Sequence, residues 1–301
     1  MSFTNNSGSK TIESRSTKEK AINISFIVFC QIFAWSVAGV LIWIAILVGF
    51  QALPAMSKFG LGFITSSSWN PPQESYGVWP EVYGTLASSF IALSISVPIG
   101  LGVAIFLSED YLPPTVQRVL VFLVELLAAI PSVVFGLWGI FVLIPFLKEI
   151  TPLQSPAMLP AALVLAIMIL PTIAAISRDA MINVPQDLRQ AAYGLGATRW
   201  ETIIQILLPA ASSGIIGGVM LALGRALGET MAVTMLIGNA NKVNFSVFAP
   251  ANSIAARLAN QFAEASGLQI AALMYAALIL FGLTLTINII AQLLVSRLQK
   301  I

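Results

Sequence analysis

The sequence contains no histidine, a single cysteine and few charged residues. The absence of histidine excludes metal sites built on imidazole and nucleophiles activated by histidine. Cys30 has no second cysteine with which to form an intrachain disulfide, and it lies in an apolar segment, where we interpret it as a small buried hydrophobe. The commoner kinds of catalysis are therefore disfavoured.

Charged residues make up only 9% of the 301 residues, whereas hydrophobic residues make up 57%. A soluble domain carries about a quarter charged residues, so the composition predicts an integral protein of the lipid bilayer. The net charge is +2, and the basic residues are spread along the chain apart from a group near its start. Nucleic-acid binding is therefore not supported.

Apolar segments of about 20 residues or more predict transmembrane helices. Strict two-residue alternation is absent, which disfavours a transmembrane barrel, so we expect an all-α polytopic fold with six crossings. The predicted crossings are Ile24–Leu53, Thr85–Leu107, Val119–Phe146, Ala157–Ile176, Ala210–Ile237 and Ile270–Leu294.

The polar residues 1–20 are interpreted as a cytoplasmic tail, and residues 21–301 as the transmembrane domain. The first apolar segment is longer than the core of a signal peptide, so we expect an uncleaved first helix. With the tail inside, most basic residues fall in inner segments, and basic residues accumulate in cytoplasmic loops. The sequence thus predicts that both termini are cytoplasmic. The outer segments would hold only Lys58, Lys148, Lys242 and Arg257.

Two predicted outer loops are candidates for contact with a partner. The first, Pro54–Val82, is rich in aromatic residues, which suit either the membrane surface or a docking surface for an extracytoplasmic partner. The second, Gly238–Gly267, is longer than connectivity requires and is a candidate for the same role.

Prolines and glycines interrupt the predicted crossings. Pro98, Pro131, Pro160 and Pro171 are interpreted as ordinary kinks or ends of packed helices. The fifth crossing carries two pairs of glycines at a spacing of four residues, which lets another helix approach closely. These pairs are Gly214 with Gly218 and Gly224 with Gly228.

Arg225 and Glu229 are charged residues within the fifth predicted crossing. A charge at bilayer depth costs about 2.5–3.5 kcal/mol on insertion scales, so each is expected to face a partner helix or an aqueous path. The two lie one turn apart on the same helix face, so we expect each to lower the other's desolvation cost. We predict that the pair contributes to a translocation path, with Thr230 beside it as a hydroxyl donor. The alternative is an ion pair that only braces helices. Glu125, in the third crossing, receives no role beyond contact with a neighbouring helix.

The loop after the fourth crossing, residues 178–209, predicts two short cytoplasmic helices joined by a turn. Pro185 suits the first turn of a helix, and Gly194–Gly196 interrupts that helix. Thr198 with Glu201 forms a capping box for a second helix, which we expect to end at Leu208-Pro209. Arg189, Arg199 and Trp200 are candidates for orienting a partner on this loop.

The segment QAAYGLGATRWETIIQILLP follows the pattern EAA, three residues, Gly, nine residues, Ile, one residue, Leu-Pro. It resembles the EAA loop of ABC-importer permease subunits, which in that family inserts into a groove on the ATP-hydrolysing subunit. Gln replaces the Glu that the family often carries at the first position. The resemblance implies an ATPase-coupling role for Gln190, Ala191, Ala192, Gly196, Ile206, Leu208 and Pro209.

A P-loop needs Gly-Lys before Ser or Thr, and the sequence contains no Gly-Lys dipeptide. In agreement with this, the resemblance implies that ATP and Mg are bound by a separate ATPase. We expect no catalytic residue, no metal and no cofactor in this chain.

Further segments narrow the resemblance to permeases of phosphate-specific ABC importers of the PstC type: SSSWNP, EVYGTLASS, AIFLSE, AAIPSVVFGLWG and GRALGETMAV. This implies a type I importer permease fold and import of inorganic phosphate. It also implies a PstA-like sister permease, a PstB-like ATPase dimer and a PstS-like extracytoplasmic phosphate-binding protein, all in a bacterial inner membrane. The alternative substrate is another oxyanion, such as molybdate or sulfate. A polytopic enzyme and a phosphate-sensing regulator are the competing classes of protein.

Overall fold

The computed structural model describes residues 17–109 and 111–298, with side chains over residues 23–109 and 111–293. Most of the predicted tail therefore lies outside the described residues. The chain divides into two compact units, Met1–Val48 and Gly49–Ile301. Helix α1 (Thr17–Phe59) makes up the described part of the first unit and ends in the second.

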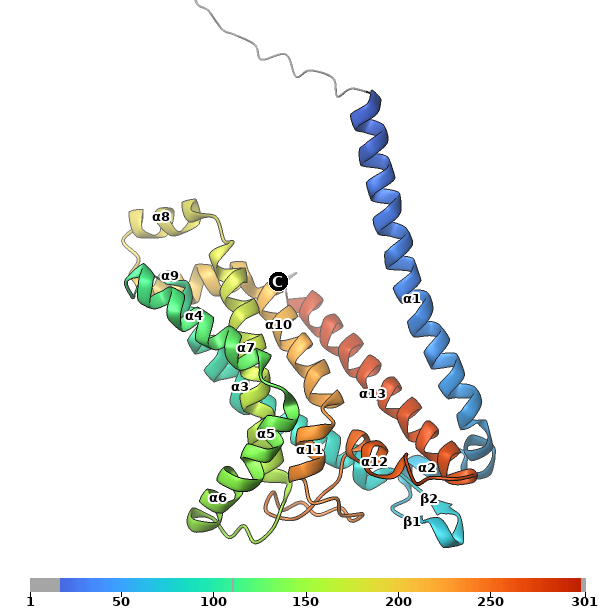
Figure 1. The fold of residues 1–301 in the computed structure, drawn as a ribbon. Helices are drawn as coiled ribbons and strands as arrows, with labels where there is room; N and C mark the ends of the chain where they lie inside the picture. Colours follow the sequence, from blue (N-terminus) through green and yellow to red (C-terminus); the bar gives the residue numbers. More distant parts are fainter. Residues whose placement is uncertain (1–16, 110, 299–301) are drawn as a thin grey trace, which may run out of the picture. The chain divides into compact units, whose positions relative to one another are not determined.

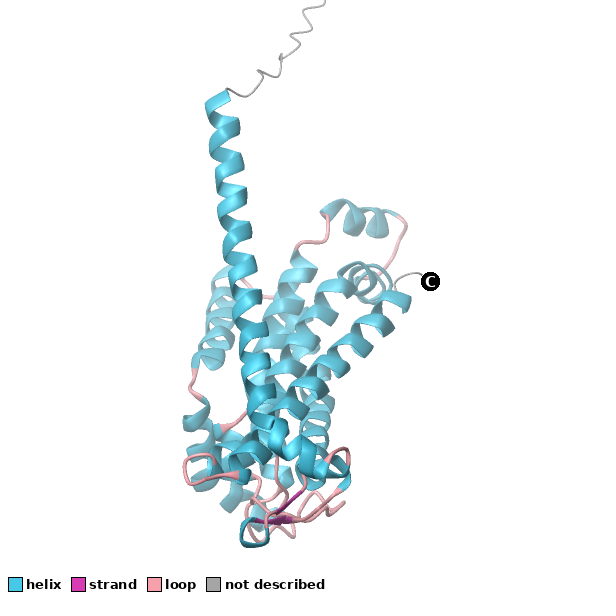
Figure 2. Cartoon of the chain, turned by 90° about the vertical axis from the view of Figure 1, so that its right-hand side faces the viewer, coloured by secondary structure: helices cyan, strands magenta, loops and turns pink. Residues whose placement is uncertain are grey.

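The described part of the second unit is mainly helical, with one two-stranded hairpin in which Trp69 lies opposite Tyr76 (Figures 1 and 2). After α1, its elements are α2 (Gly62–Thr65), β1 (Trp69–Asn70), the 3-10 turn η1 (Pro71–Gln73), β2 (Ser75–Tyr76), α3 (Trp79–Ser108), α4 (Pro114–Ala129), α5 (Ser132–Trp138), the π-helical turn η2 (Gly139–Leu143), α6 (Ile144–Ile150), α7 (Met158–Ile182), α8 (Gln186–Gly194), α9 (Arg199–Thr202), the π-helical turn η3 (Ile203–Leu207), α10 (Leu208–Gly228), α11 (Met231–Leu236), α12 (Ile254–Gln261) and α13 (Leu268–Leu298).

Among the described residues, six helical segments are long and apolar enough to cross a membrane, which confirms the predicted all-α polytopic fold. They are Asn23–Phe59, Trp79–Ser108, Ser132–Ile150, Met158–Ile182, Arg199–Gly228 and Leu268–Leu293. The predicted third crossing, Val119–Phe146, is interrupted at Ile130, so the spanning segment is Ser132–Ile150 and begins after the break. The predicted fifth crossing, Ala210–Ile237, leaves the helix at Glu229.

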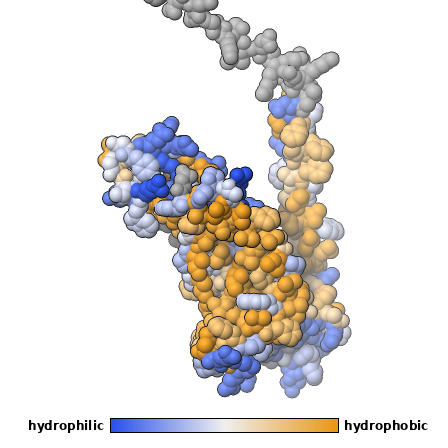
Figure 3. Space-filling view, turned by 60° about the vertical axis from the view of Figure 1, so that its left-hand side comes forward, coloured by the Kyte–Doolittle hydropathy of each residue, from blue (hydrophilic) through white to orange (hydrophobic). Residues whose placement is uncertain are grey.

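Apolar side chains cover the middle of the second unit, and hydrophilic residues gather at its two ends (Figure 3). One end carries α8 and α9, and we call it the α8 end. The other carries the β1–β2 hairpin and α12, and we call it the hairpin end (Figure 1). An apolar band between two polar ends is the arrangement that a bilayer requires of a spanning protein.

Helix α3 packs closely against α7, the most enclosed of the spanning helices. A Cβ added at Gly100 would lie only 3.0 Å from Cγ2 of Ile173, and the Ser96 hydroxyl donates a hydrogen bond of 2.9 Å to the Ala166 carbonyl. Small residues let helix backbones approach in this way. In α3 a small buried residue recurs at every fourth position: Gly84, Ser88, Ala92, Ser96, Gly100 and Ala104.

Among the described residues, only one of the two predicted glycine pairs in the fifth crossing packs against another helix. A Cβ added at Gly218 would lie 3.1 Å from Cβ of Ile176 on α7, and one at Gly214 would meet the Ala180 side chain. At Gly224 and Gly228, an added Cβ would have no described neighbour within 4 Å. That second part of α10 is therefore open to a partner outside the described chain.

We predict that Gly84→Ala destabilises the hairpin end, because the added methyl group would collide with the backbone carbonyl oxygen of Asn252. Overpacking of this kind costs about 1–3 kcal/mol. Gly102→Ala, in the same helix, is the matched control, since its Cβ would meet nothing within 4 Å. Thermal unfolding of the detergent-solubilised protein should show a lower midpoint for Gly84→Ala alone, and equal midpoints would contradict the packing described.

Candidate translocation path and coupling segment

The fifth crossing breaks at the residues predicted to line the path. Helix α10 ends at Gly228, Glu229 has an extended backbone (φ −66°, ψ 125°), and α11 begins at Met231. Gly228 favours such an end because glycine has a low helix propensity. The break places Glu229 and Thr230 between two helical segments instead of inside one.

The predicted ion pair between Arg225 and Glu229 is not formed among the described residues. Arg225 lies in the last turn of α10, where a cation is favourable at the negative end of the helix dipole. Its half-buried side chain makes no hydrogen bond or ion pair with any described residue. Glu229 is the C-cap of α10, and its carboxylate instead accepts a hydrogen bond from the Ala232 amide of α11.

Hydrogen bonds across the break satisfy part of its backbone. The Thr230 hydroxyl donates to the Gly228 carbonyl at 3.2 Å, and the Thr230 carbonyl accepts from both N and Oγ1 of Thr234. The Glu229 carboxylate accepts a hydrogen bond of 3.5 Å from the Ala232 amide. Irregular backbone at membrane depth needs such partners, since lipid offers none.

The third crossing breaks at Ile130-Pro131, and its continuation packs against that of the fifth. Ile130 is extended, as is usual for a residue before proline. Beyond the break, α5 and η2 pack closely against α11. A Cβ added at Gly136 would lie 2.6 Å from the sulfur of Met235, and one added at Gly139 would lie 2.7 Å from Cδ1 of Leu236. The two interrupted crossings therefore share one packed region just beyond their breaks.

Residues 186–209, which we call the coupling segment, form α8, a turn, α9, η3 and the first two residues of α10. Gln190 and Ala191 are exposed on α8, whereas Ala192 is buried. The two adjacent alanines thus differ, because only Ala191 presents its small side chain outward. Leu195, in the turn, is 90% exposed, which leaves a large apolar side chain available to a partner.

The turn of the coupling segment has the local chemistry that the sequence predicts. Gly196 adopts a left-handed backbone with φ of 87°, which glycine does without strain. Thr198 and Glu201 form both hydrogen bonds of the predicted capping box: Oγ1 of Thr198 accepts from the Glu201 amide, and the Glu201 carboxylate accepts from the Thr198 amide.

The prediction that the second short helix ends at Leu208-Pro209 is wrong, because α9 continues through η3 into α10. In the wider turn of η3 the Leu208 amide donates to the Ile203 carbonyl. This widening accommodates Pro209, which has no amide hydrogen to donate. Ile206 and Leu208 are half-buried in this stretch, and Pro209 is exposed.

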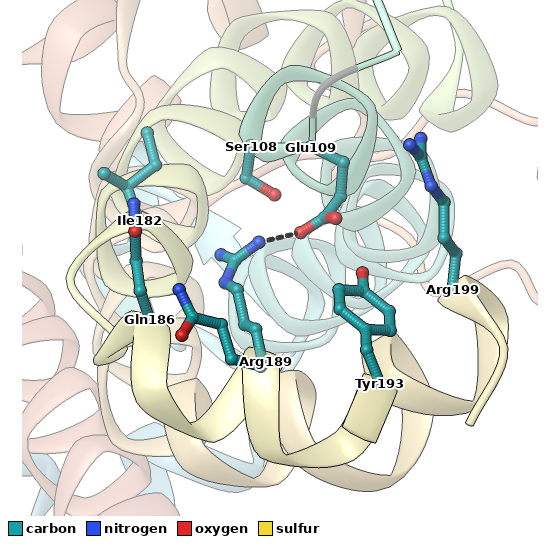
Figure 4. A pocket seen from close by; sticks show the side chains of 8 residues that line it. Ser108, Glu109, Ile182, Gln186, Arg189, Tyr193 and Arg199 are labelled. Atoms are coloured by element: carbon teal, nitrogen blue, oxygen red, sulfur yellow. Dashed lines mark hydrogen bonds and ion pairs between the residues drawn. The ribbon is translucent and has the colours of Figure 1, made fainter. Parts of the chain in front are cut away.

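Arg189 attaches α8 to two other elements. Its guanidinium forms an ion pair with Glu109, the C-cap of α3, and donates a hydrogen bond of 3.0 Å to the Met181 carbonyl of α7. Figure 4 shows this pair in a pocket of about 330 Å³ at the α8 end. The pocket is lined by Ser108, Glu109, Ile182, Gln186, Arg189, Gln190, Tyr193 and Arg199.

A second buried ion pair, at the hairpin end, joins Glu81 to Arg257, with 1% and 4% of their side chains exposed. Sequence analysis missed it: Arg257 was assigned only to an outer loop, and Glu81 received no role. The available signal was an acid directly before the second crossing and an arginine in the last outer loop.

Glu125, on α4, is exposed and lines a small pocket between α3, α4 and α7 that also includes Arg178 and Asp179. No ion pair joins it to another described residue. The structure therefore adds a location for this carboxylate and no further role.

Comparison with protein families matches residues 96–300 to the binding-protein-dependent transport system inner membrane component. The chain is similar to the phosphate transport system permease protein PstC of Pasteurella multocida, at 46% identity over 83% of this chain and 84% of that protein. It is also similar to PstC of Mesorhizobium japonicum, at 45% identity over 81% of each chain. A probable PstC of Methanocaldococcus jannaschii is 32% identical over 93% of this chain and 95% of that protein.

Solved structures of ABC importers share the fold. A bacterial ABC transporter involved in alginate import matches with a TM-score of 0.62 at 17% identity, over 94% of this chain and 99% of that chain. The MetNI methionine transporter, in an inward-facing conformation, matches with a TM-score of 0.58 at 20% identity, over 76% and 99%. Together with the six spanning segments, these matches show that the chain belongs to the family of inner membrane components of binding-protein-dependent transport systems, and within it to the PstC type of permease.

Proposed function

We propose that this chain is the permease subunit through which inorganic phosphate enters the cytoplasm, driven by ATP hydrolysis in partner subunits. The similarity to PstC permeases supports the substrate. The structural observation that carries the proposal is the half-buried guanidinium of Arg225 at the end of α10, which has no ion-pair partner among the described residues. An arginine within a spanning segment marks a path or a partner.

Arg225 suits an oxyanion because its planar guanidinium offers several N–H donors to phosphate oxygens. Glu229 follows at the break, and its negative charge keeps the site from holding phosphate tightly. Phosphate near neutral pH carries a proton that sulfate lacks, so the Glu229 carboxylate can accept a hydrogen bond from one anion and not from the other. The Thr230 hydroxyl donates its only hydrogen to the Gly228 carbonyl and holds the break, so it can act as the predicted donor to phosphate only by exchanging that bond.

The partners follow from the surfaces of the second unit. We propose that the sister permease closes on the open face of α10 at Gly224 and Gly228, beside Arg225. The coupling segment engages one subunit of an ATPase dimer, which binds ATP and Mg, and this chain itself holds no cofactor. The hairpin end receives the extracytoplasmic phosphate-binding protein. We propose that both termini are cytoplasmic in a bacterial cell, which the excess of basic residues in the predicted inner segments supports.

The alternative substrate is another oxyanion, such as molybdate or sulfate. The coupling segment identifies the class of transporter but does not identify the transported solute. Reconstitution of the complete importer in proteoliposomes separates the two. We expect ATP-dependent uptake of labelled phosphate that an excess of sulfate or molybdate does not compete away. Uptake of sulfate or molybdate without phosphate uptake would contradict the proposed substrate.

We predict that Arg225→Ala lowers phosphate uptake about tenfold or more, since a hydrogen bond to a charged group contributes about 1.5–3 kcal/mol. Arg225→Lys should retain part of the activity, because it keeps the charge and loses the planar fork. Arg118→Ala is the matched control, since this exposed arginine of α4 lies away from the break. Normal uptake by Arg225→Ala at normal membrane abundance would contradict the role of the arginine in the path.

We predict that Glu229→Gln weakens the preference for phosphate over sulfate, because the amide keeps the shape and removes the negative charge. The measurement is initial uptake of labelled phosphate with increasing sulfate as competitor, in the reconstituted importer. Glu125→Gln, the same substitution in an exposed carboxylate of α4, is the control. An unchanged competition curve for Glu229→Gln would remove this residue from anion selection.

A further inference from the structure

Helix α3 carries a buried carboxylate at each end, and each is paired with an arginine from a distant segment. Glu81, in its first turn, pairs with Arg257 of α12, and Glu109, its C-cap, pairs with Arg189 of α8. Only 1% of the Glu81 side chain and 8% of the Glu109 side chain are exposed. A buried pair holds its elements together more firmly than an exposed one, because loss of one partner leaves an uncompensated buried charge.

At the hairpin end, the Glu81–Arg257 pair joins four segments. Arg257 Nε donates to Glu81 Oε1 at 2.9 Å, and Nη2 contacts both Glu81 and Oδ1 of Asn241, in the loop after α11. The guanidinium also lies over the Trp69 ring of the hairpin, 4.7 Å from its centroid. Movement of the hairpin or of α12 is therefore transmitted to the start of α3 and to the loop that follows α11.

Two polar atoms of this cluster remain unsatisfied. Glu81 Oε2 and Trp69 Nε1 are buried and have no hydrogen-bond partner among the described residues. A buried group without a partner destabilises the arrangement that contains it. The cluster thus leaves one acceptor and one donor for which a rearranged hairpin end can supply partners.

At the α8 end, Arg189 connects the coupling segment to the other end of α3 (Figure 4). It pairs with Glu109 and also donates to the Met181 carbonyl, so that α8 is attached to α3 and α7 together. Between its two ends, α3 is held to α7 by the Ser96 hydrogen bond and the close contact at Gly100. The helix has 30 residues and spans about 45 Å at 1.5 Å per residue.

We propose that α3 transmits movement between the coupling segment and the hairpin end, with Glu109 and Glu81 as the positioning residues that attach it at either end. This inference rests on the proposed importer function and deepens it, because it names the route by which binding-protein docking reaches the ATPase. Neither carboxylate touches the transported anion in this route.

The test is ATP hydrolysis by the complete importer in proteoliposomes, with and without phosphate-loaded binding protein. Glu81→Gln and Glu109→Gln should each lower the stimulation by binding protein about fivefold or more, as expected for loss of coupling between two sites. The basal hydrolysis rate should stay unchanged. The double variant should lose no more stimulation than the more affected single variant, because residues acting on one route are not additive.

Matched controls are Glu125→Gln and Asp179→Asn, which neutralise exposed carboxylates of α4 and α7 that lie outside the proposed route. Both should retain wild-type stimulation. Where a Gln variant does not assemble, Glu81→Asp and Glu109→Asp keep the charge but shorten the side chain, and they should show the same loss.

Wild-type stimulation in the Gln or Asp variants, additive losses, or equal losses in the controls would overturn the proposal. Failure of both variants at one site to assemble would also overturn it, since that outcome assigns the pair to folding alone. The phosphate proposal fails separately, if the wild-type importer is stimulated by its binding protein yet takes up no phosphate.

Discussion

The close packing of α3 on α7 is the contact on which the rest of the second unit depends. Small buried residues bring the two backbones together, and the Ser96 hydroxyl adds a direct bond to the Ala166 carbonyl. Helix α10 packs on α7 through Gly214 and Gly218. Because α3 and α10 both pack on α7, this uninterrupted helix supports the unit, while other crossings are interrupted or expose one face.

Interruption of a spanning helix is permitted only where protein replaces the lost hydrogen bonds, because lipid has no donors or acceptors. At the fifth crossing, Thr230 and Glu229 supply some of these bonds, and α11 then packs on α5, beyond the break at Pro131. The half-buried Arg225 lies one turn before the break at Glu229. The site proposed for phosphate is thus a consequence of two interrupted helices that support each other.

The coupling segment could be predicted from sequence because its chemistry is local. Gly196 supplies the left-handed turn, and Thr198 with Glu201 closes a capping box within four residues. The six spanning segments were likewise predictable from apolar length. The breaks were not, because the apolar pattern continues across Glu229 and because Pro131 also suits a kinked but continuous helix.

The buried ion pairs lay beyond prediction for a different reason. Glu81 and Arg257 are 176 residues apart, and Glu109 and Arg189 are 80 apart, so only the fold brings them together. The four-residue spacing of small residues in α3 was visible in the sequence and would have indicated its close contact with another helix.

The central claim is that Arg225 meets phosphate during passage, and a structure of the complete importer trapped with phosphate in the membrane tests it most directly. An ATPase-inactive complex with phosphate-loaded binding protein provides the trapped state. The account predicts phosphate oxygens about 2.7–2.9 Å from the Arg225 guanidinium nitrogens, beside the break at Glu229. An Arg225 paired with a carboxylate of the sister permease, with phosphate passing elsewhere, would contradict it.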